Sequence, residues 1–243
     1  MLLFSYLAAI AISLISGVIA APGQLFERVG APTDVEKRAG TFFSFWSEGG
    51  GNFRCNNGGG GSYTTTWSGN GGFVCGKGYS PGGSRWAISL EAKWPLLGHY
   101  LLIFHRTIKY SGTYTPTGPG YLALYGWTRN PLIEYYIVDS YDVLLPGEPW
   151  TKKGNFTFEE GSYDLYQSTR VNKPSIEGTR TFQQYWSVRT EKRVGGTITT
   201  GRHFTEWNNV GLKMGYHDYQ ILATEGFTNG KNISSGSSSI TVD

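Results

Sequence analysis

Residues 121–139 read YLALYGWTRNPLIEYYIVD, which is two aromatic-rich runs separated by a turn signal. Tyr, Trp, Ile and Val favour strands and Asn-Pro favours a turn, so the segment predicts a β-hairpin of strands 121–127 and 132–139. Side chains alternate between the faces of a strand. The hairpin therefore has one largely aliphatic face and one face that carries Tyr125 and Tyr136.

The rest of the chain repeats this pattern of short strands and turns. Of 243 residues 35 are Gly, aromatic residues make up 15% and charged residues 16%, a composition that excludes a disordered chain and a helical bundle. Further strands are expected over 41–46, 63–67, 73–75, 155–158, 163–171, 181–189, 196–200, 219–227 and 238–242. The spacing of Phe204, Trp207 and Val210 predicts one helix, ended by Gly215. These elements predict an all-β fold, a sandwich or β-jelly roll of two twisted antiparallel sheets with one short α-helix.

Two carboxylates fall in the middle of predicted strands. Glu134 shares its face with Tyr136, and Glu225 shares its face with Tyr219. Burying a carboxylate is costly unless it is hydrated or hydrogen-bonded, so both positions need an explanation. One interpretation is structural ion pairing with an arginine, and the candidate partners are Arg129, Arg170 and Arg189. The other interpretation is a functional pair of carboxyl groups.

The residues around both glutamates resemble one known family. Residues 125–138 closely resemble the nucleophile motif of glycoside hydrolase family 11, the β-jelly-roll endo-1,4-β-xylanases, in its secreted fungal type. ATEGF at 223–227 is similar to the acid/base motif, RVNKPSI at 170–176 to the thumb loop, and QYWSVR at 184–189 to the strand behind it. The resemblance runs from about 41 to 242 in the same order, with one interruption.

This resemblance implies retaining endo-hydrolysis of the 1,4-β-D-xylosidic linkages of xylan. Glu134 would be the nucleophile, and Glu225 would be first the acid and then the base. The charge of Glu134 would raise the pKa of Glu225, while Arg170 would help to keep Glu134 ionised. Tyr136 would hydrogen-bond the nucleophile and the sugar, with Tyr125 beside it. The reaction needs no cofactor and no metal.

The resemblance also implies how the sugar chain is held. Tyr219 and Gln184 would line the cleft, and Pro174 and Ile176 would press on the sugar from the thumb. Trp46 would stack on a xylose ring, because a flat sugar face suits an aromatic platform. The alternative for Trp46 is a plain core aromatic.

One position departs from the family pattern and bears on pH. The residue before the strand of Phe73 usually is Asn or Asp, hydrogen-bonded to the acid/base, but here it is Gly72. The family rules for the pH optimum therefore do not transfer. Two other functions stay open: a xylan-binding or plant-defence-eliciting protein on the same scaffold, and a β-1,4-glucanase of a related jelly-roll family. The thumb sequence with Pro174 and Ile176 favours xylose, since a tight cleft excludes the hydroxymethyl group of glucose.

The N-terminal segment predicts a secreted protein. Residues 1–20 are apolar and uncharged and end in small residues, as in a signal peptide, with a membrane anchor as the alternative. Residues 21–38 end in Lys37-Arg38 and predict a propeptide, which leaves 39–243 as the catalytic domain. The net charge of +3 comes with no cluster of Lys and Arg, so we expect no nucleic-acid partner, and we expect a monomer whose partner is xylan.

Two further features suit a secreted protein. Cys55 and Cys75 are the two cysteines, and they form either a disulfide or two separate thiols. Asn155 and Asn232 begin glycosylation sequons.

Residues 86–106 interrupt the family pattern and are rich in Trp, Leu, Ile and Phe. We interpret these 21 residues as an unspliced intron, because their length suits a small fungal intron and 100–106 can be encoded by codons that contain a branch site and an acceptor. A binding flap or a partner-docking segment is the alternative.

Overall fold

The computed structural model describes residues 26–29, 42–92, 99–144, 149–228 and 232–243. The predicted signal peptide (1–20), most of the predicted propeptide (21–38) and the predicted start of the catalytic domain at residue 39 lie outside the described residues. The chain separates into two compact units, residues 1–35 with 86–104 and residues 36–85 with 105–243. The second unit holds both predicted sheets.

The larger sheet of this unit has eight strands. Their order is β11 (Thr151–Phe158), β12 (Gly161–Ser175), β13 (Gly178–Arg189), β10 (Ile133–Tyr141), β9 (Gly120–Arg129), β15 (Tyr216–Gly226), β5 (Phe73–Tyr79) and β2 (Phe42–Ser47). The predicted hairpin is β9–β10, with Glu134 opposite Trp127. Neighbouring strands are antiparallel except β10 and β13, which are parallel.

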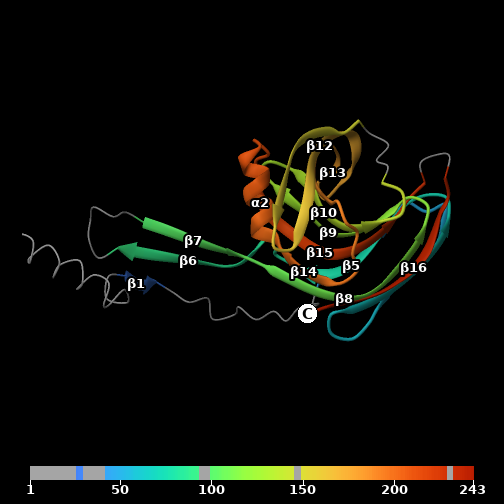
Figure 1. The fold of residues 1–243 in the computed structure, drawn as a ribbon, viewed down its shortest axis with the longest axis horizontal. Coiled ribbons are helices and arrows are strands. Elements are labelled where there is room, and N and C mark those ends of the chain that lie inside the picture. Colours follow the sequence, from blue (N-terminus) through green and yellow to red (C-terminus); the bar gives the residue numbers. More distant parts are fainter. Residues whose placement is uncertain (1–25, 30–41, 93–98, 145–148, 229–231) are drawn as a thin grey trace, which may run out of the picture. The chain divides into compact units, whose positions relative to one another are not determined.

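The second sheet has five strands, and it lies against the first (Figure 1). Its order is β14 (Gly196–Thr199), β8 (Thr107–Thr117), β16 (Ser234–Val242), β4 (Ser62–Gly69) and β3 (Gly51–Asn57). The helix α2 (Thr200–Asn209) buries Phe204 and Trp207 against Tyr135 of β10. The predicted β-jelly roll of two sheets is confirmed, with one helix among the described residues of this unit. Two details differ: the helix ends at Asn209, before Gly215, and one strand pair is parallel.

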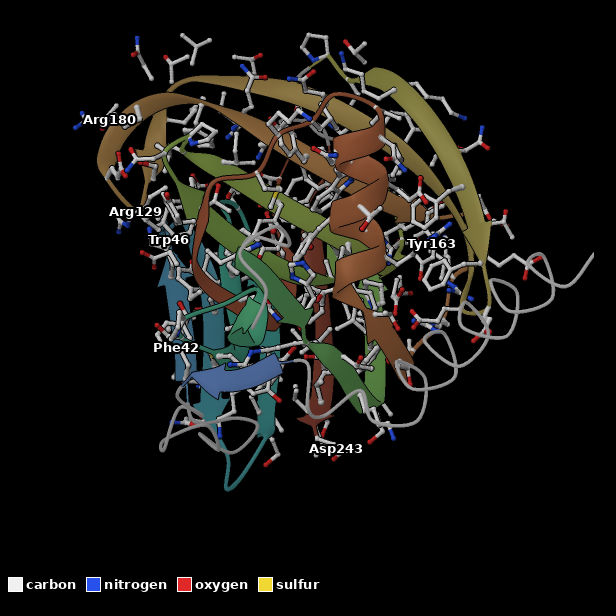
Figure 2. All side chains as sticks on the ribbon, turned by 90° about the vertical axis from the view of Figure 1, so that its left-hand side faces the viewer. Phe42, Trp46, Arg129, Tyr163, Arg180 and Asp243 are labelled. Carbon is white, nitrogen blue, oxygen red and sulfur yellow. A yellow bond between two sulfur atoms is a disulfide. The ribbon has the colours of Figure 1, made fainter. Side chains whose placement is uncertain are left out.

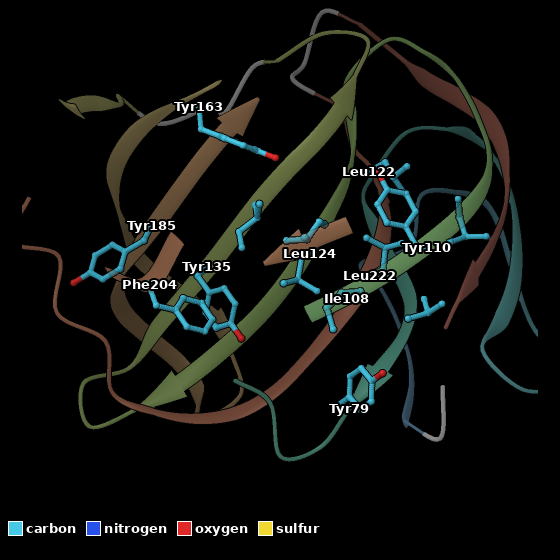
Figure 3. Packing of buried hydrophobic residues seen from close by; sticks show 14 of the residues in the cluster. Tyr79, Ile108, Tyr110, Leu122, Leu124, Tyr135, Tyr163, Tyr185, Phe204 and Leu222 are labelled. Atoms are coloured by element: carbon cyan, nitrogen blue, oxygen red, sulfur yellow. The ribbon is translucent and has the colours of Figure 1, made fainter. Parts of the chain in front are cut away.

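Alternation along the strands produces two apolar clusters on opposite faces of the eight-stranded sheet. One lies between the sheets and contains Leu122, Leu124 and Leu222 (Figure 3). The other lies on the outer, cleft face and contains Tyr125 and Tyr136. The predicted division of the hairpin into an aliphatic and an aromatic face is therefore confirmed.

Covalent and polar links tie the two sheets together. Cys55 of β3 and Cys75 of β5 form a disulfide, so of the two alternatives left by the sequence the structure has the disulfide. Between the sheets, the Tyr63 and Thr224 hydroxyls lie 3.1 Å apart and those of Thr224 and Ser238 2.7 Å apart. Buried hydroxyls paired in this way avoid the desolvation cost of unsatisfied polar groups.

The first unit contains a sheet of three strands in the order β1 (Phe26–Val29), β6 (Ser84–Ala92) and β7 (His99–His105). β1 falls in the predicted propeptide and pairs antiparallel with β6, which falls largely in the predicted insertion. The two segments that the sequence sets apart from the catalytic domain thus pair with each other. Within the second unit, the Arg106 amide donates to the Gly83 carbonyl at 3.1 Å, so the chain enters and leaves the insertion at neighbouring points.

Candidate active site

The cleft face of the eight-stranded sheet holds a cavity of about 680 Å3. All ten residues that the sequence predicted for the site line this cavity: Trp46, Tyr125, Glu134, Tyr136, Arg170, Pro174, Ile176, Gln184, Tyr219 and Glu225. They come from six strands and the thumb turn, and they are separated by up to 179 residues in sequence. The fold brings together every residue that the resemblance implied.

Glu134 is 8% exposed and its carboxylate is held by three side-chain donors. At Oε1 the Tyr125 hydroxyl donates at 2.9 Å and the Tyr136 hydroxyl at 3.1 Å. At Oε2 the Gln184 amide donates at 2.6 Å. Both oxygens are therefore bonded in the ionised form, and the carboxylate is fixed in one orientation.

The Gln184 amide is itself oriented by a second chain of hydrogen bonds. The Ser168 hydroxyl donates to Gln184 Oε1 at 2.9 Å, and the Trp186 indole donates to the Ser168 hydroxyl at 3.2 Å. Since Oε1 of Gln184 is occupied as an acceptor, its amide nitrogen faces Glu134 as a donor. Tyr125 is fixed similarly, because the Trp127 indole donates to its hydroxyl at 2.5 Å.

Glu225 lies in a different environment. Its Oε2 atom is buried and has no hydrogen-bond partner among the residues described. Burial is the largest cause that raises its pKa, the charge of Glu134 adds to it, and the resulting pKa is about 8. The sequence predicted the charge of Glu134 as the cause, whereas desolvation of the carboxyl group, whose Oε2 atom is buried, comes first.

Burial also raises the pKa of Glu134, but hydrogen bonds from Gln184, Tyr125 and Tyr136 act in the opposite direction. The charge of Arg170 lowers the pKa of both Glu134 and Glu225. A hydrogen bond from Tyr136 also lowers the pKa of Glu225, so one hydroxyl lies within reach of both carboxyl groups. The two environments therefore favour an ionised Glu134 beside a protonated Glu225.

The alternative of structural ion pairs is wrong for two of the three arginines. Arg129 binds Glu177 and Asp218, at 3.0 Å and 2.7 Å. Arg189 donates to the Glu191 carbonyl and to the Tyr163 hydroxyl. Arg170 lines the cavity itself. Among these three arginines, the charge that acts on both Glu134 and Glu225 is thus that of Arg170.

Aromatic rings form the walls of the cleft. Tyr136 stacks on Trp186 with ring centroids 3.9 Å apart and an interplanar angle of 5°. Trp46 is 47% exposed, so its alternative interpretation as a plain core aromatic is wrong. Figure 2 shows Trp46 and Phe42 at opposite ends of β2, and Phe42 in turn packs on Tyr219 at 5.1 Å.

The sequence did not single out several residues of the site. Trp127, Ser168 and Trp186 support the polar groups around Glu134, and Trp127 and Trp186 stand within the quoted motifs, so their place on the cleft face was available from alternation. Glu48 also lines the cleft, and a Cβ at Gly72 would lie 3.1 Å from its Oε1 atom. The space beside the glycine that departs from the family pattern is therefore faced by a carboxyl group.

Within the described ranges there is no group of three or more His, Cys, Asp or Glu side chains placed to hold a metal ion. His203, on the first turn of α2, is fully buried and packs edge-on against Tyr163 at 4.6 Å. No helix in the described part of the chain has the length and apolarity needed to cross a membrane.

Fold and site together define a class of protein. A jelly roll whose cleft carries two carboxyl groups, one bonded by three donors and one with its pKa raised to about 8, has the arrangement of glycoside hydrolases. Comparison with known proteins then gives the family. The sequence profile of Glycosyl hydrolases family 11 matches residues 38–241, and the chain belongs to this family. The resemblance drawn from the motifs and the prediction of an enzyme are confirmed.

Named relatives and a solved structure agree with this assignment. Endo-1,4-beta-xylanase 11B of Humicola insolens is 43% identical over 236 residues, which is 95% of this chain and 72% of the relative. Ethylene-inducing xylanase 1 of Verticillium dahliae is 43% identical over 239 residues, 96% of each chain. A solved structure from a comparison of two major endo-1,4-beta-xylanases of Trichoderma reesei superposes with a TM-score of 0.67 at 32% identity, covering 84% of this chain and 99% of that one.

Proposed function

We propose that the protein is an endo-1,4-β-xylanase that hydrolyses xylan with retention of configuration. The observation that carries this proposal is the contrast between the two cleft carboxyl groups. Glu134 accepts three hydrogen bonds, while the Oε2 atom of Glu225 is buried without a partner among the described residues and the pKa of Glu225 is about 8. A retaining hydrolase needs such a pair, since one group must attack as an anion while the other must supply a proton.

In the first step, Glu134 attacks the anomeric carbon and forms a covalent glycosyl-enzyme. The proton of Glu225 passes to the glycosidic oxygen as the bond to the leaving sugar breaks. In the second step, the now ionised Glu225 takes a proton from water, and the resulting hydroxide displaces Glu134 from the sugar. The fixed orientation of Glu134 supports the first role, and the buried environment of Glu225 supports the second.

The cleft also suits an extended chain of flat sugars. Trp46 offers a half-exposed ring for stacking, and Pro174 and Ile176 line the opposite, thumb side of the cavity. Relatives from Humicola insolens and Verticillium dahliae are named as xylanases, which favours xylan over a β-1,4-glucan. We further propose that the protein is secreted and acts as a monomer, consistent with the signal-peptide pattern of residues 1–20.

A second candidate function is the elicitation of a plant response. It is favoured by the name of the Verticillium dahliae relative, an ethylene-inducing xylanase that is 43% identical over 96% of both chains. This function and hydrolysis do not exclude each other. Applying Glu134→Gln protein to leaf tissue separates them, because elicitation that depends on the folded surface survives this substitution and elicitation by released sugars does not.

The main test is reducing-sugar release by the full chain from xylan and, for comparison, from soluble cellulose. We expect release from xylan only, and none from the Glu134→Gln protein. Proton NMR of the first products should show the β-anomer, as retention requires. Folded protein without xylan hydrolysis would contradict the proposal, and initial α-anomer would contradict the retaining mechanism alone.

A further inference from the structure

The hairpin β12–β13 ends in a tight turn, residues 173–178, which we call the thumb tip. Two internal hydrogen bonds hold it: the Ser175 hydroxyl donates to the Gly178 carbonyl at 2.6 Å, and the Glu177 amide donates to the Ser175 hydroxyl at 3.0 Å. Gly178 has a φ of +79°, a conformation that suits glycine. The thumb tip is therefore a self-supported unit whose position depends on its contacts with the rest of the sheet.

One such contact is an ion pair that spans three elements. Arg129, the last residue of β9, donates through its guanidinium NH1 group to Glu177 of the thumb tip at 3.0 Å. Through Nε it donates to Asp218 of β15 at 2.7 Å. In Figure 2, Arg129 lies below the curved end of the hairpin that is marked by Arg180. One guanidinium thus joins the thumb tip to the floor of the sheet.

Asp218, at the other end of this ion-pair bridge, lies in an irregular part of the β15 backbone. The pairing of β15 with β9 shifts register between His217 and Gln220. The Gly82 amide donates to the Asp218 carbonyl at 3.0 Å and fixes the chain within this irregularity. The next residue, Tyr219, lines the cleft. Arg129 is therefore anchored at its Asp218 end beside a residue of the cleft wall.

The ion pair of Arg129 with Glu177 is weaker than its ion pair with Asp218. The Arg129 and Glu177 side chains are 42% and 32% exposed, so their attraction is screened by salt and can break and re-form. Ser175 and Ile176 precede Glu177 in the sequence, and both line the cavity. Ile176 also packs against the aromatic cluster on the cleft face. A movement of Glu177 away from Arg129 would therefore also move Ser175 and Ile176, which form part of the cleft wall.

We propose that Arg129 is a positioning residue of this enzyme, which holds the thumb tip over the cleft through Glu177 while anchored on Asp218. The inference rests on the proposed function, since it assigns Arg129 a part in holding the sugar chain at that same cleft. A weak, exposed pair closes the cleft on a bound chain and still allows the thumb to open when the polymer enters and the product leaves.

The test uses Glu177→Gln, which removes one charge from the thumb side and leaves Arg129 and Asp218 in place. The matched control is Glu159→Gln, the same chemical change at an exposed carboxylate in the turn between β11 and β12. Two quantities are measured: hydrogen exchange of the amides at 173–178 without substrate, and kcat and KM on linear xylo-oligosaccharides. Both are taken between about 0.01 M and about 1 M NaCl, where the Debye length falls from about 30 Å to about 3 Å.

For Glu177→Gln we expect faster exchange of the thumb-tip amides and a KM about two- to fivefold higher, without a lower kcat, which is the range of an exposed ion pair. The parent and Glu159→Gln proteins should approach these values as salt is added, whereas Glu177→Gln should not change. A double-mutant cycle with Arg129→Gln should show that the two substitutions are not additive.

Exchange and KM that match the Glu159→Gln control at every salt concentration would overturn the proposal. A loss of kcat with unchanged thumb-tip exchange would also overturn it, since it would place Glu177 in the chemistry. Hydrolysis by the parent protein is recorded first, so a failure of the proposed function is recognised separately. In that case the exchange measurement alone decides whether Arg129 holds the thumb tip.

Discussion

Glu134 and Gln184 lie opposite each other on the parallel strands β10 and β13, and the Gln184 amide donates to the Glu134 carboxylate at 2.6 Å. The parallel pairing therefore has a direct consequence for the site. It brings β13, the strand behind the thumb, alongside Glu134 and supplies a donor for Oε2, the carboxylate oxygen that the two tyrosines do not reach.

Replacing Gln184 by Leu should lower kcat about 10- to 100-fold, which corresponds to the loss of a hydrogen bond to a charged group, about 1.5–3 kcal/mol. The substitution keeps the volume but leaves Oε2 of Glu134 buried without its donor. The matched control is Gln183→Leu, because Gln183 is the neighbour on β13 whose side chain bonds Gln167 and Thr169 instead. Steady-state kinetics on xylan measure both, and equal kcat values for the two variants would contradict the role of Gln184.

The pKa of about 8 at Glu225 predicts the alkaline limb of the pH profile. The proposed reaction needs Glu225 protonated, so kcat/KM should fall as the pH rises through about 8. The charge of Glu134 contributes to this shift, so Glu134→Gln should lower the pKa of Glu225. Carbon NMR titration of the Glu225 carboxyl group in both proteins measures the change. A pKa that stays the same in Glu134→Gln would show that burial alone sets it.

Alternation along the strands was enough to predict the faces of the sheet. Because the side-chain period of a strand is two, Tyr136 had to share a face with Glu134, and Tyr125 a face with Trp127, and they do. The composition, rich in glycine and aromatic residues, similarly predicted the fold class. These properties are local, so they can be read from the chain without knowing which strands pair.

Strand order and register could not be predicted from the same patterns. The parallel pairing of β13 with β10 places Gln184 opposite Glu134, and the antiparallel pairing of β12 with β13 places Ser168 opposite Gln184. Both pairings depend on contacts between residues distant in sequence. The proximity of Glu48 to Gly72 likewise results from the pairing of β2 with β5. Neither Ser168 nor Glu48 belongs to one of the sequence motifs, so no local signal marked these two residues.

His203 predicts a loss of stability in acid. Burial lowers its pKa to about 3, and neither ring nitrogen has a hydrogen-bond partner among the described residues. The unfolded chain takes up a proton near pH 6.5, whereas the folded chain resists it until about pH 3. The free energy of unfolding therefore carries no penalty from His203 above about pH 6.5. As the pH falls from there towards 3, it decreases by up to about 1.4 kcal/mol per pH unit.

The variant His203→Phe removes this titration and keeps a ring against Tyr163 and Trp207. We expect its free energy of unfolding to be close to that of the parent at pH 7 and to exceed it by about 1–3 kcal/mol near pH 4. Urea unfolding at both pH values measures the difference, with the pH 7 pair as the internal control. A difference that is the same at both pH values would contradict the assignment to His203.

Residues 86–106 give the last prediction. The jelly roll has its sheets, disulfide and cleft within residues 36–85 and 105–243, and the Gly83 and Arg106 backbones are already hydrogen-bonded at 3.1 Å. A protein in which Arg85 is joined directly to Thr107 should therefore fold, hydrolyse xylan and unfold at a temperature no lower than the full chain. It lacks the apolar residues of 86–104, so it should also aggregate less. Sequencing the transcript across this region tests the intron interpretation separately, since a message that keeps all 21 codons would exclude it. If the shortened protein does not fold, residues 86–106 are part of the working structure, and the binding-flap alternative becomes the better one.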